Sequence, residues 1–548
     1  MSIIKKIEKQ LRVNKTYLLA LLLISPMLTT LLIFNYQSTV SPDESFQLQT
    51  AKRFAENKGF TYSIGFIHEQ AIPDNLNEEN YGFMSRWPFG LSVLVSLFLV
   101  IGLSTNQSIV IIKIIFVLLG LFYWIKFSQN FLKNNWTHEL IFITYITLLA
   151  YNLFGPTSDL ICWALSPIIF HYIIIKSPHR LKNIVKASIL ASIIIFIKYS
   201  FWAILPIGVL FYIFRYYDNF NKMIKSSLTY SILPILSIIL VFYINSLGQF
   251  QETDVQKVSV INLFNNMNIE WLFYIFSSLT IDPIKITPII LKMNNIFNLN
   301  LFEVMKFGIS TLIIFGIIYI FYKALHHKKY NNDIYMLTIS AIIGLVVFII
   351  FVNTIHNPSN PSLNSTRYYH PILPLIPITI LYYFDKKNFN ITSFTNKIIN
   401  GIILLIFLAF IFIWTVRTVQ DLTWHENHKE RVTNFIENIT SESETKSLII
   451  ATKNFPWFLQ NEKYITYRSF EMLSDKDKFF EKPMFIFVIE NKNQVRESYK
   501  EKVLTENKRK RSYFNKYKHN LDKYSFNDNQ IGDLIIHWKK FDEKPNFE

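Results

Sequence analysis

The sequence holds a single cysteine, Cys162, among its 548 residues. One cysteine excludes an intramolecular disulfide and a cysteine-based metal cluster. The chain also lacks the glycine-rich phosphate loop, the dinucleotide-binding fingerprint and the helix motif of zinc proteases. No signature in the sequence therefore supports a nucleotide-driven cytoplasmic enzyme.

Charged residues are scarce, at 17%, whereas hydrophobic residues make up 51% of the chain. Apolar runs of membrane-spanning length recur as far as about Val416, and a polar tail follows. The first run follows a lysine-rich start, but it is too long for a signal peptide and lacks a small-residue cleavage site. We therefore predict an all-α polytopic membrane domain over residues 1–420 and a small soluble α/β domain over residues 421–548. In the second domain, an amphipathic helix with Val432, Phe435, Ile436 and Ile439 should lead to short strands at residues 448–451, 484–489 and 534–538.

Roughly eleven segments are predicted to cross the membrane. These are residues 16–34, 109–126, 139–153, 160–175, 184–198, 201–214, 224–244, 304–322, 334–352, 371–384 and 398–416. Basic residues gather at the ends that should face the cytoplasm. This pattern predicts a multi-pass protein of the cell membrane with a cytoplasmic N-terminus and an extracytoplasmic C-terminal domain. The formal net charge of +16 is attributed to this topology and to anionic membrane lipids rather than to nucleic acid.

One further apolar run, residues 88–102, would break this alternation if it crossed the membrane. Lys126 and the basic segment 176–186 would then be forced to the outside. We therefore predict a juxtamembrane helix that lies on the outer surface. Under this topology several ionisable residues lie near the outer face: Asp43, Arg86, Asp159, Lys198 and Arg367.

A helix-like segment follows the first predicted span. It opens at residues 41–44 and stops at residues 57–59. Ser41 suits the N-cap position and Glu44 the acidic position of a capping box. The helix dipole favours a charged carboxylate at Asp43, in the first turn. The two acids are therefore either simple helix-start residues or a catalytic pair at the membrane surface.

Ionisable side chains within membrane spans are costly, so each one indicates a candidate functional residue. Lys198 lies between two apolar runs, where it either snorkels to the interface or points into an outer cavity. Asp159 begins a helix after a short turn, as an N-cap or as a site acid. Lys113 lies near the outer end of its span, where snorkelling cations are common. Arg367 ends a polar outer loop, and a guanidinium group suits the geometry of phosphate.

Together these residues predict an outward-facing cavity lined by acids and cations. The acids are Asp43, Glu44 and Asp159, and the cations are Lys198, Arg367, Arg86 and Lys113. A carboxylate can take a proton from an acceptor while fixed cations stabilise a departing phosphate. Because water-soluble nucleotide sugars are absent outside the cell membrane, the predicted donor is a phosphate-linked lipid.

Several features of residues 16–420 occur together in one known group of enzymes. They are Pro42-Asp43-Glu44 with the following helix, Arg86-Trp87-Pro88-Phe89-Gly90 before a surface helix, Asp159 at the start of its span, Lys198 at a hairpin, and Arg367-Tyr368 before a proline-rich span. In this layout the chain resembles the membrane-embedded glycosyltransferases of superfamily C, in the branch of the protein O-mannosyltransferases and aminoarabinose transferases. The resemblance implies a polyprenyl-phosphate sugar as donor and an extracytoplasmic lipid, glycan or protein as acceptor. It also implies that Asp43 is the base, that Asp159 is a second site acid, and that Lys198 and Arg367 bind the donor phosphate.

Metal binding is the point at which this sequence departs from that group. The aminoarabinose transferases carry a glutamate near the position of Arg86. The spacing of His68, His356 and His370 matches no ligand motif. A divalent metal ion therefore stays open as a cofactor, with no ligand assigned.

Two other functions stay open. A transporter or flippase of lipid-linked saccharides would predict two symmetry-related halves, and no internal repeat is visible. A surface-polysaccharide polymerase or ligase would be a transferase of another membrane fold. The acidic segment after the first span favours an inverting glycosyltransferase over this second alternative.

Overall fold

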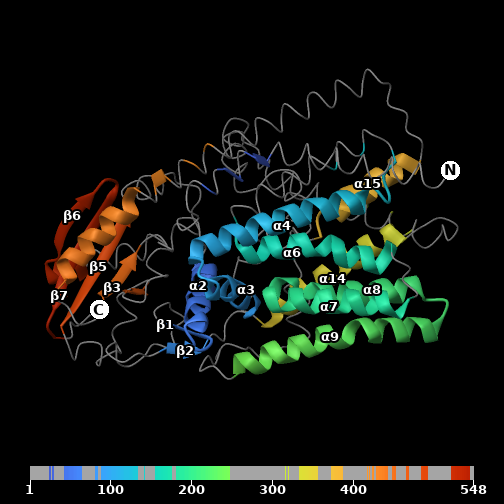
Figure 1. Cartoon of the computed structure of the whole chain (residues 1–548), viewed down its shortest axis with the longest axis horizontal. Coiled ribbons are helices and arrows are strands. Elements are labelled where there is room, and N and C mark those ends of the chain that lie inside the picture. The colour runs from blue at the N-terminus through green and yellow to red at the C-terminus, as the bar shows by residue number, and fades with distance from the viewer. Residues whose placement is uncertain are drawn as a thin grey trace, which may run out of the picture. The chain divides into compact units, whose positions relative to one another are not determined.

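The computed structural model describes part of the chain, and helices dominate that part (Figure 1). Apart from a few isolated positions, the described residues are 42–63, 81–83, 88–133, 155–175, 180–246, 333–355, 372–386, 427–441, 447–451, 464–467, 483–491 and 520–543. The chain divides into two compact units. The first comprises Met1–Thr29, Ile111–Tyr243 and Glu252–Thr415, and the second comprises Thr30–Val110, Ile244–Gln251 and Val416–Glu548.

Three helices in the described part are long and apolar enough to cross a membrane. They are α4 (Thr105–Ser128), α6 (Thr157–Phe170) with the π-helix that continues it (His171–Ile175), and α9 (Phe220–Ser246). They coincide with the predicted spans 109–126, 160–175 and 224–244. These three predictions are confirmed as long apolar helices, and they indicate a membrane-associated protein.

Four further predicted spans are also helical. They correspond to α7 (Leu181–Ile197), α8 (Ile204–Arg215) with the 3-10 turn η3 before it (Tyr199–Ala203), α14 (Asp333–Ile355) and α15 (Leu375–Lys386). The predicted spans 16–34, 139–153, 304–322 and 398–416 lie outside the described residues, apart from isolated positions. The number of eleven spans therefore stays a prediction.

Polar and small side chains hold the apolar helices of the first unit together. The indole N–H of Trp124 in α4 donates to the carbonyl of Trp163 in α6 (3.0 Å). The Ser188 hydroxyl of α7 donates to the Tyr230 carbonyl of α9 (2.7 Å), and the Tyr230 hydroxyl donates to a carbonyl of α8 (2.9 Å). A Cβ atom at Gly208 would lie 2.1 Å from the Tyr230 ring, so α8 needs glycine there. Such contacts replace the hydrophobic driving force that helices lack inside a membrane.

The first helix of the second unit, α2 (Pro42–Ala55), begins where local signals predict it. Its end is a Schellman motif, because the Asn57 amide donates to Phe54 (3.1 Å) and the Lys58 amide to Arg53 (2.8 Å). Asn57 has a left-handed backbone (φ 60°), which asparagine tolerates better than most residues. The predicted stop at residues 57–59 is confirmed.

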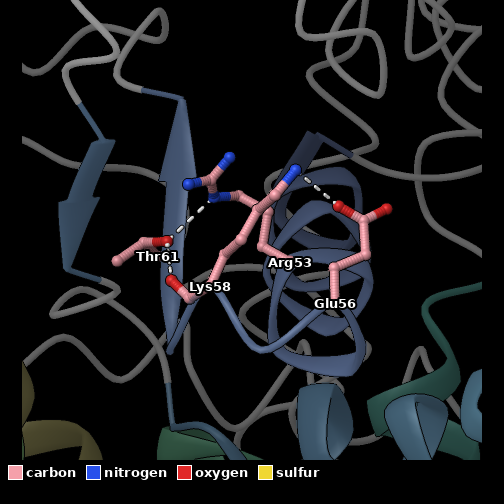
Figure 2. Close-up of polar contacts among 4 residues, drawn as sticks. All are labelled: Arg53, Glu56, Lys58 and Thr61. Atoms are coloured by element: carbon pink, nitrogen blue, oxygen red, sulfur yellow. Dashed lines mark hydrogen bonds and ion pairs between the residues drawn. The ribbon is translucent and has the colours of Figure 1, made fainter.

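Polar contacts fasten this helix end to the short strand β1 (Thr61–Ser63), which pairs with β2 (Tyr81–Phe83). Figure 2 shows Arg53 donating from Nε to the Thr61 hydroxyl (2.8 Å), which in turn donates to the Lys58 carbonyl (2.9 Å). The Lys58 ammonium pairs with Glu56 (2.8 Å), and this hydrogen bond lowers the pKa of the Glu56 carboxyl group. These contacts fix the direction in which the chain leaves α2 and enters β1.

The apolar run 88–102 forms α3 (Gly90–Val100), which packs against α2. The Ser92 hydroxyl donates to the Gln47 carbonyl of α2 (2.9 Å). Eleven helical residues extend about 16 Å, whereas the hydrocarbon core of a bilayer is about 30 Å thick. The length of α3 therefore favours a surface helix rather than a span.

This short helix gives a test of topology. If α3 lies on the outer surface, cysteines at positions 90 and 105 should react with an impermeant thiol reagent from the same, outer side, because only four residues separate α3 from α4. The labelling uses Cys162→Ser as background. A cysteine at position 126, at the other end of α4, serves as the control and should react only from inside. Labelling of positions 90 and 105 from opposite sides would mean that α3 crosses the membrane.

The C-terminal part contains the predicted small sheet. Its order is β4-β3-β5-β7-β6, from β3 (Ser447–Ala451), β4 (Tyr464–Tyr467), β5 (Met484–Asn491), β6 (Asn527–Ile531) and β7 (Leu534–Phe541). β4, β3 and β5 are parallel, and β7 pairs antiparallel with β5 and β6. The predicted strands 448–451, 484–489 and 534–538 are confirmed, whereas β4 and β6 were not predicted.

A helix over residues 427–440 covers one face of this sheet. Its buried residues Val432 and Ile436 pack in one core with Ile449, Phe487 and Ile536 from three strands. The amphipathic pattern that predicts this helix therefore also identifies the face that it buries.

Candidate functional site

Three of the predicted site residues meet at the start of α6, in the first unit. Lys113 comes from α4, Asp159 from the first turn of α6, and Lys198 from the break between α7 and η3. The turn Gly155-Pro156 leads into α6, and Pro156 occupies its N-cap position without a side-chain cap. Asp159 is therefore a residue of the first helical turn, not the N-cap.

Asp159 and Lys198 form an ion pair between Oδ1 and Nζ. Their side chains are 4% and 14% exposed. Lys198 has an extended backbone (φ −156°, ψ 132°) where α7 stops, so it belongs to neither helix. Its ammonium pairs with a buried carboxylate. The structure thus brings together two residues that lie 39 positions apart in the sequence.

The second oxygen of Asp159 has a different environment. Oδ2 is buried and has no hydrogen-bond partner among the described residues. Trp163 follows one turn later, on the same side of α6, and its indole N–H is likewise buried without an acceptor in that part of the chain. Buried polar atoms are usually bonded, so this acceptor and this donor are exceptions for which the described residues supply no partner. Sequence reasoning missed Trp163 because a tryptophan in an apolar helix looks like a core residue.

Lys113 is completely buried, and its ammonium donates to the Gly155 carbonyl (2.7 Å). This bond fixes the turn from which α6 starts. An ammonium group is costly to bury without such contacts. If all three side chains are ionised, the site holds two positive charges and one negative charge, and the N-terminus of α6 adds a partial positive charge. The arrangement favours an anionic ligand.

Asp43 and Glu44 belong to the second unit. Asp43 lies in the first turn of α2, as predicted. Glu44 is only 1% exposed, which does not fit a merely solvated helix-start residue. A carboxylate buried to this degree needs partners or a function.

The remaining predicted residues are not placed. Arg86 and Arg367 lie outside the described residues, and so do His68, His356 and His370. Within the described part, no three histidine, cysteine, aspartate or glutamate side chains gather as metal ligands. No residue there is therefore assigned to a divalent ion.

Two buried carboxylates at the other end of the first unit were not singled out from the sequence. Asp333, at the start of α14, pairs with Arg215 at the end of α8 (2.7 Å). Asp385, near the end of α15, accepts hydrogen bonds from the Lys133 amide (2.5 Å) and the Thr137 hydroxyl (3.3 Å). The signal that could have found them is an isolated acid beside the basic end of an apolar helix. We call these contacts the far-end contacts, because Lys113 and Lys198 lie near the opposite ends of α4 and of the η3–α8 segment.

Comparison with known proteins does not identify the chain. No family model matches it, and no curated protein matches it. The functional argument therefore depends on the residues themselves.

Proposed function

We propose that the chain is an integral-membrane glycosyltransferase that moves a sugar from a polyprenyl-phosphate donor to an extracytoplasmic acceptor. The observation that carries this proposal is the buried pair of Asp159 and Lys198 at the start of an apolar helix. Ionisable groups at such depth are expensive and are typically kept for function. The excess of positive charge around them suits a lipid phosphate that enters from the bilayer.

In the proposed reaction, a hydroxyl group of the acceptor attacks the anomeric carbon of the donor sugar. The bond from that carbon to the phosphate oxygen breaks, and polyprenyl phosphate leaves with the electron pair. Asp43 takes the proton of the attacking hydroxyl, and the configuration at the anomeric carbon inverts. Lys198 and Arg367, with the N-terminus of α6, stabilise the charge that develops on the phosphate. Lys113 supports this arrangement by fixing the turn before α6.

The proposal is tested first by donor binding. Arg367→Ala and Lys198→Ala should each weaken binding of a polyprenyl-phosphate sugar by about 1–3 kcal/mol, or about 5–150-fold in Kd, the cost of losing a charge-assisted hydrogen bond. Binding is measured with the purified full chain in lipid nanodiscs.

The matched control is Lys126→Ala, which removes a lysine from the opposite end of α4 and should leave the affinity unchanged. Wild-type affinity in both site variants would remove their assignment as phosphate ligands. A protein that binds the donor but transfers no sugar to any acceptor would instead be a carrier of lipid-linked saccharides.

A further inference from the structure

Helix α2 is unusual because it is polar and yet buried. Every residue from Glu44 to Ala51 is buried, and five of these eight residues are polar. Two of the polar residues, Gln47 and Thr50, are 4% and 0% exposed. Such a helix cannot be explained as a simple amphipathic element with one solvated face.

Gln47 and Thr50 each hold an unsatisfied atom. The Gln47 side-chain oxygen and the Thr50 hydroxyl are buried and have no hydrogen-bond partner among the described residues. Leaving such a group buried and unbonded costs about 1–3 kcal/mol. The two residues are three positions apart, so they are neighbours on one face of the helix. Two neighbouring unsatisfied groups favour a ligand that bonds to both.

Phe54 continues the same face one turn further. It lies seven positions after Gln47 and four after Thr50, and it is 38% exposed. Its ring stacks on Phe60 (centroids 4.0 Å apart, planes at 19°), and Phe60 contacts Phe89 (5.9 Å). Arg53, beside it, is held by Thr61 at the start of β1 (Figure 2). The face thus joins two polar groups to an aromatic surface that the fold holds in place.

We propose that Gln47, Thr50 and Phe54 form a binding site for a hexopyranose ring. Sugar hydroxyl groups both donate and accept hydrogen bonds, so they match an amide oxygen and a threonine hydroxyl. The C–H face of the ring suits an aromatic surface. Ligand sites commonly combine a few polar groups with aromatic walls in this way. The choice of a sugar depends on the proposed function, in which the hexose belongs either to the donor or to a glycan acceptor.

The test uses conservative variants of the full chain in nanodiscs. The probes are the methyl glycosides of mannose, glucose and galactose, and polyprenyl phosphate with and without each of these sugars. At least one hexose probe should bind the wild type. Gln47→Leu and Thr50→Val should each weaken its binding about tenfold. Phe54→Leu should weaken it as well. Both polar-to-apolar changes should leave the melting temperature unchanged or higher, because they remove buried unsatisfied groups.

Ser96→Ala is the matched control. It removes a buried hydroxyl from the neighbouring helix α3, but that hydroxyl is already bonded to the Val93 carbonyl (2.7 Å). Hexose binding should therefore not change. Suppose that the wild type binds polyprenyl phosphate more tightly when it carries a sugar. If the variants lose this difference and still bind polyprenyl phosphate itself, the site binds the donor sugar. If they lose only methyl-glycoside binding, it binds the acceptor.

Failure of this inference differs from failure of the proposed function. If the protein binds and uses the donor, but Gln47→Leu and Thr50→Val bind every hexose probe as the wild type does, the sugar site is wrong and the transferase stands. The absence of any sugar-dependent binding by the wild type also overturns the site. If neither polyprenyl phosphate nor its glycosides bind, the transferase is wrong. In that case, loss of methyl-glycoside binding in Thr50→Val would still support the sugar site.

Discussion

Replacing Asp43 with asparagine is expected to lower turnover about 10²–10⁴-fold, the usual effect of losing a general base, while donor binding changes little. Asparagine keeps the shape of the side chain and much of its ability to bond backbone N–H groups at a helix start. It cannot, however, take the proton from the attacking hydroxyl group. The measurement is single-turnover transfer by purified, monodisperse variants in lipid, with donor binding measured in parallel.

Glu44→Gln serves as the comparison, since Glu44 is the next residue of the same helical turn. Its effect should be milder, because a glutamine still completes a capping box. If Asp43 were only a helix-start residue, Asp43→Asn would cost a fraction of a kcal/mol in stability and leave transfer almost intact. A folded Asp43→Asn protein that binds donor and transfers at the wild-type rate would exclude Asp43 as the base.

Removing Lys198 is expected to have the second-largest effect, this time on stability. Lys198→Ala leaves the Asp159 carboxylate buried without its cation, and breaking a buried pair in this way typically costs about 3–5 kcal/mol in the free energy of unfolding. The measurement is reversible unfolding in lipid or detergent micelles.

The double variant Asp159→Asn/Lys198→Met separates the two roles of this lysine. It removes both charges together, so it should recover most of the lost stability. It should not recover donor binding, because the phosphate still lacks its cation. If the double variant were as unstable as Lys198→Ala alone, the instability would come from lost packing rather than from an unpaired acid.

The helix boundaries of α2 could be predicted from the sequence because their causes are local. Proline in the first turn and the sequence Asn57-Lys58-Gly59 at the stop determine the backbone at each end. The spans at α4, α6 and α9 could also be predicted, because hydrophobicity over a whole helix is a strong signal. Strand β6 could not, since its sequence is mostly polar and contains no alternating hydrophobic pattern.

The charged residues of the site could be selected from the sequence, but their contacts could not. Asp159 and Lys198 were placed on the same side of the membrane by counting spans, yet their direct pairing depends on how α6 and α7 pack. Lys113 was grouped with the phosphate-binding cations, whereas its ammonium is bonded to the Gly155 carbonyl. The polar face of α2 was missed for the same reason, because burial of a glutamine or a threonine is decided by what packs against it.

The far-end contacts have a mechanical consequence. Arg215 with Asp333, and Asp385 with Lys133 and Thr137, join the ends of four helical segments through buried polar groups. At the opposite ends, Lys113 is bonded to Gly155 and Lys198 is paired with Asp159, so both ends of the first unit are held by buried polar contacts. A carrier that alternates its openings would have to break these contacts in every cycle.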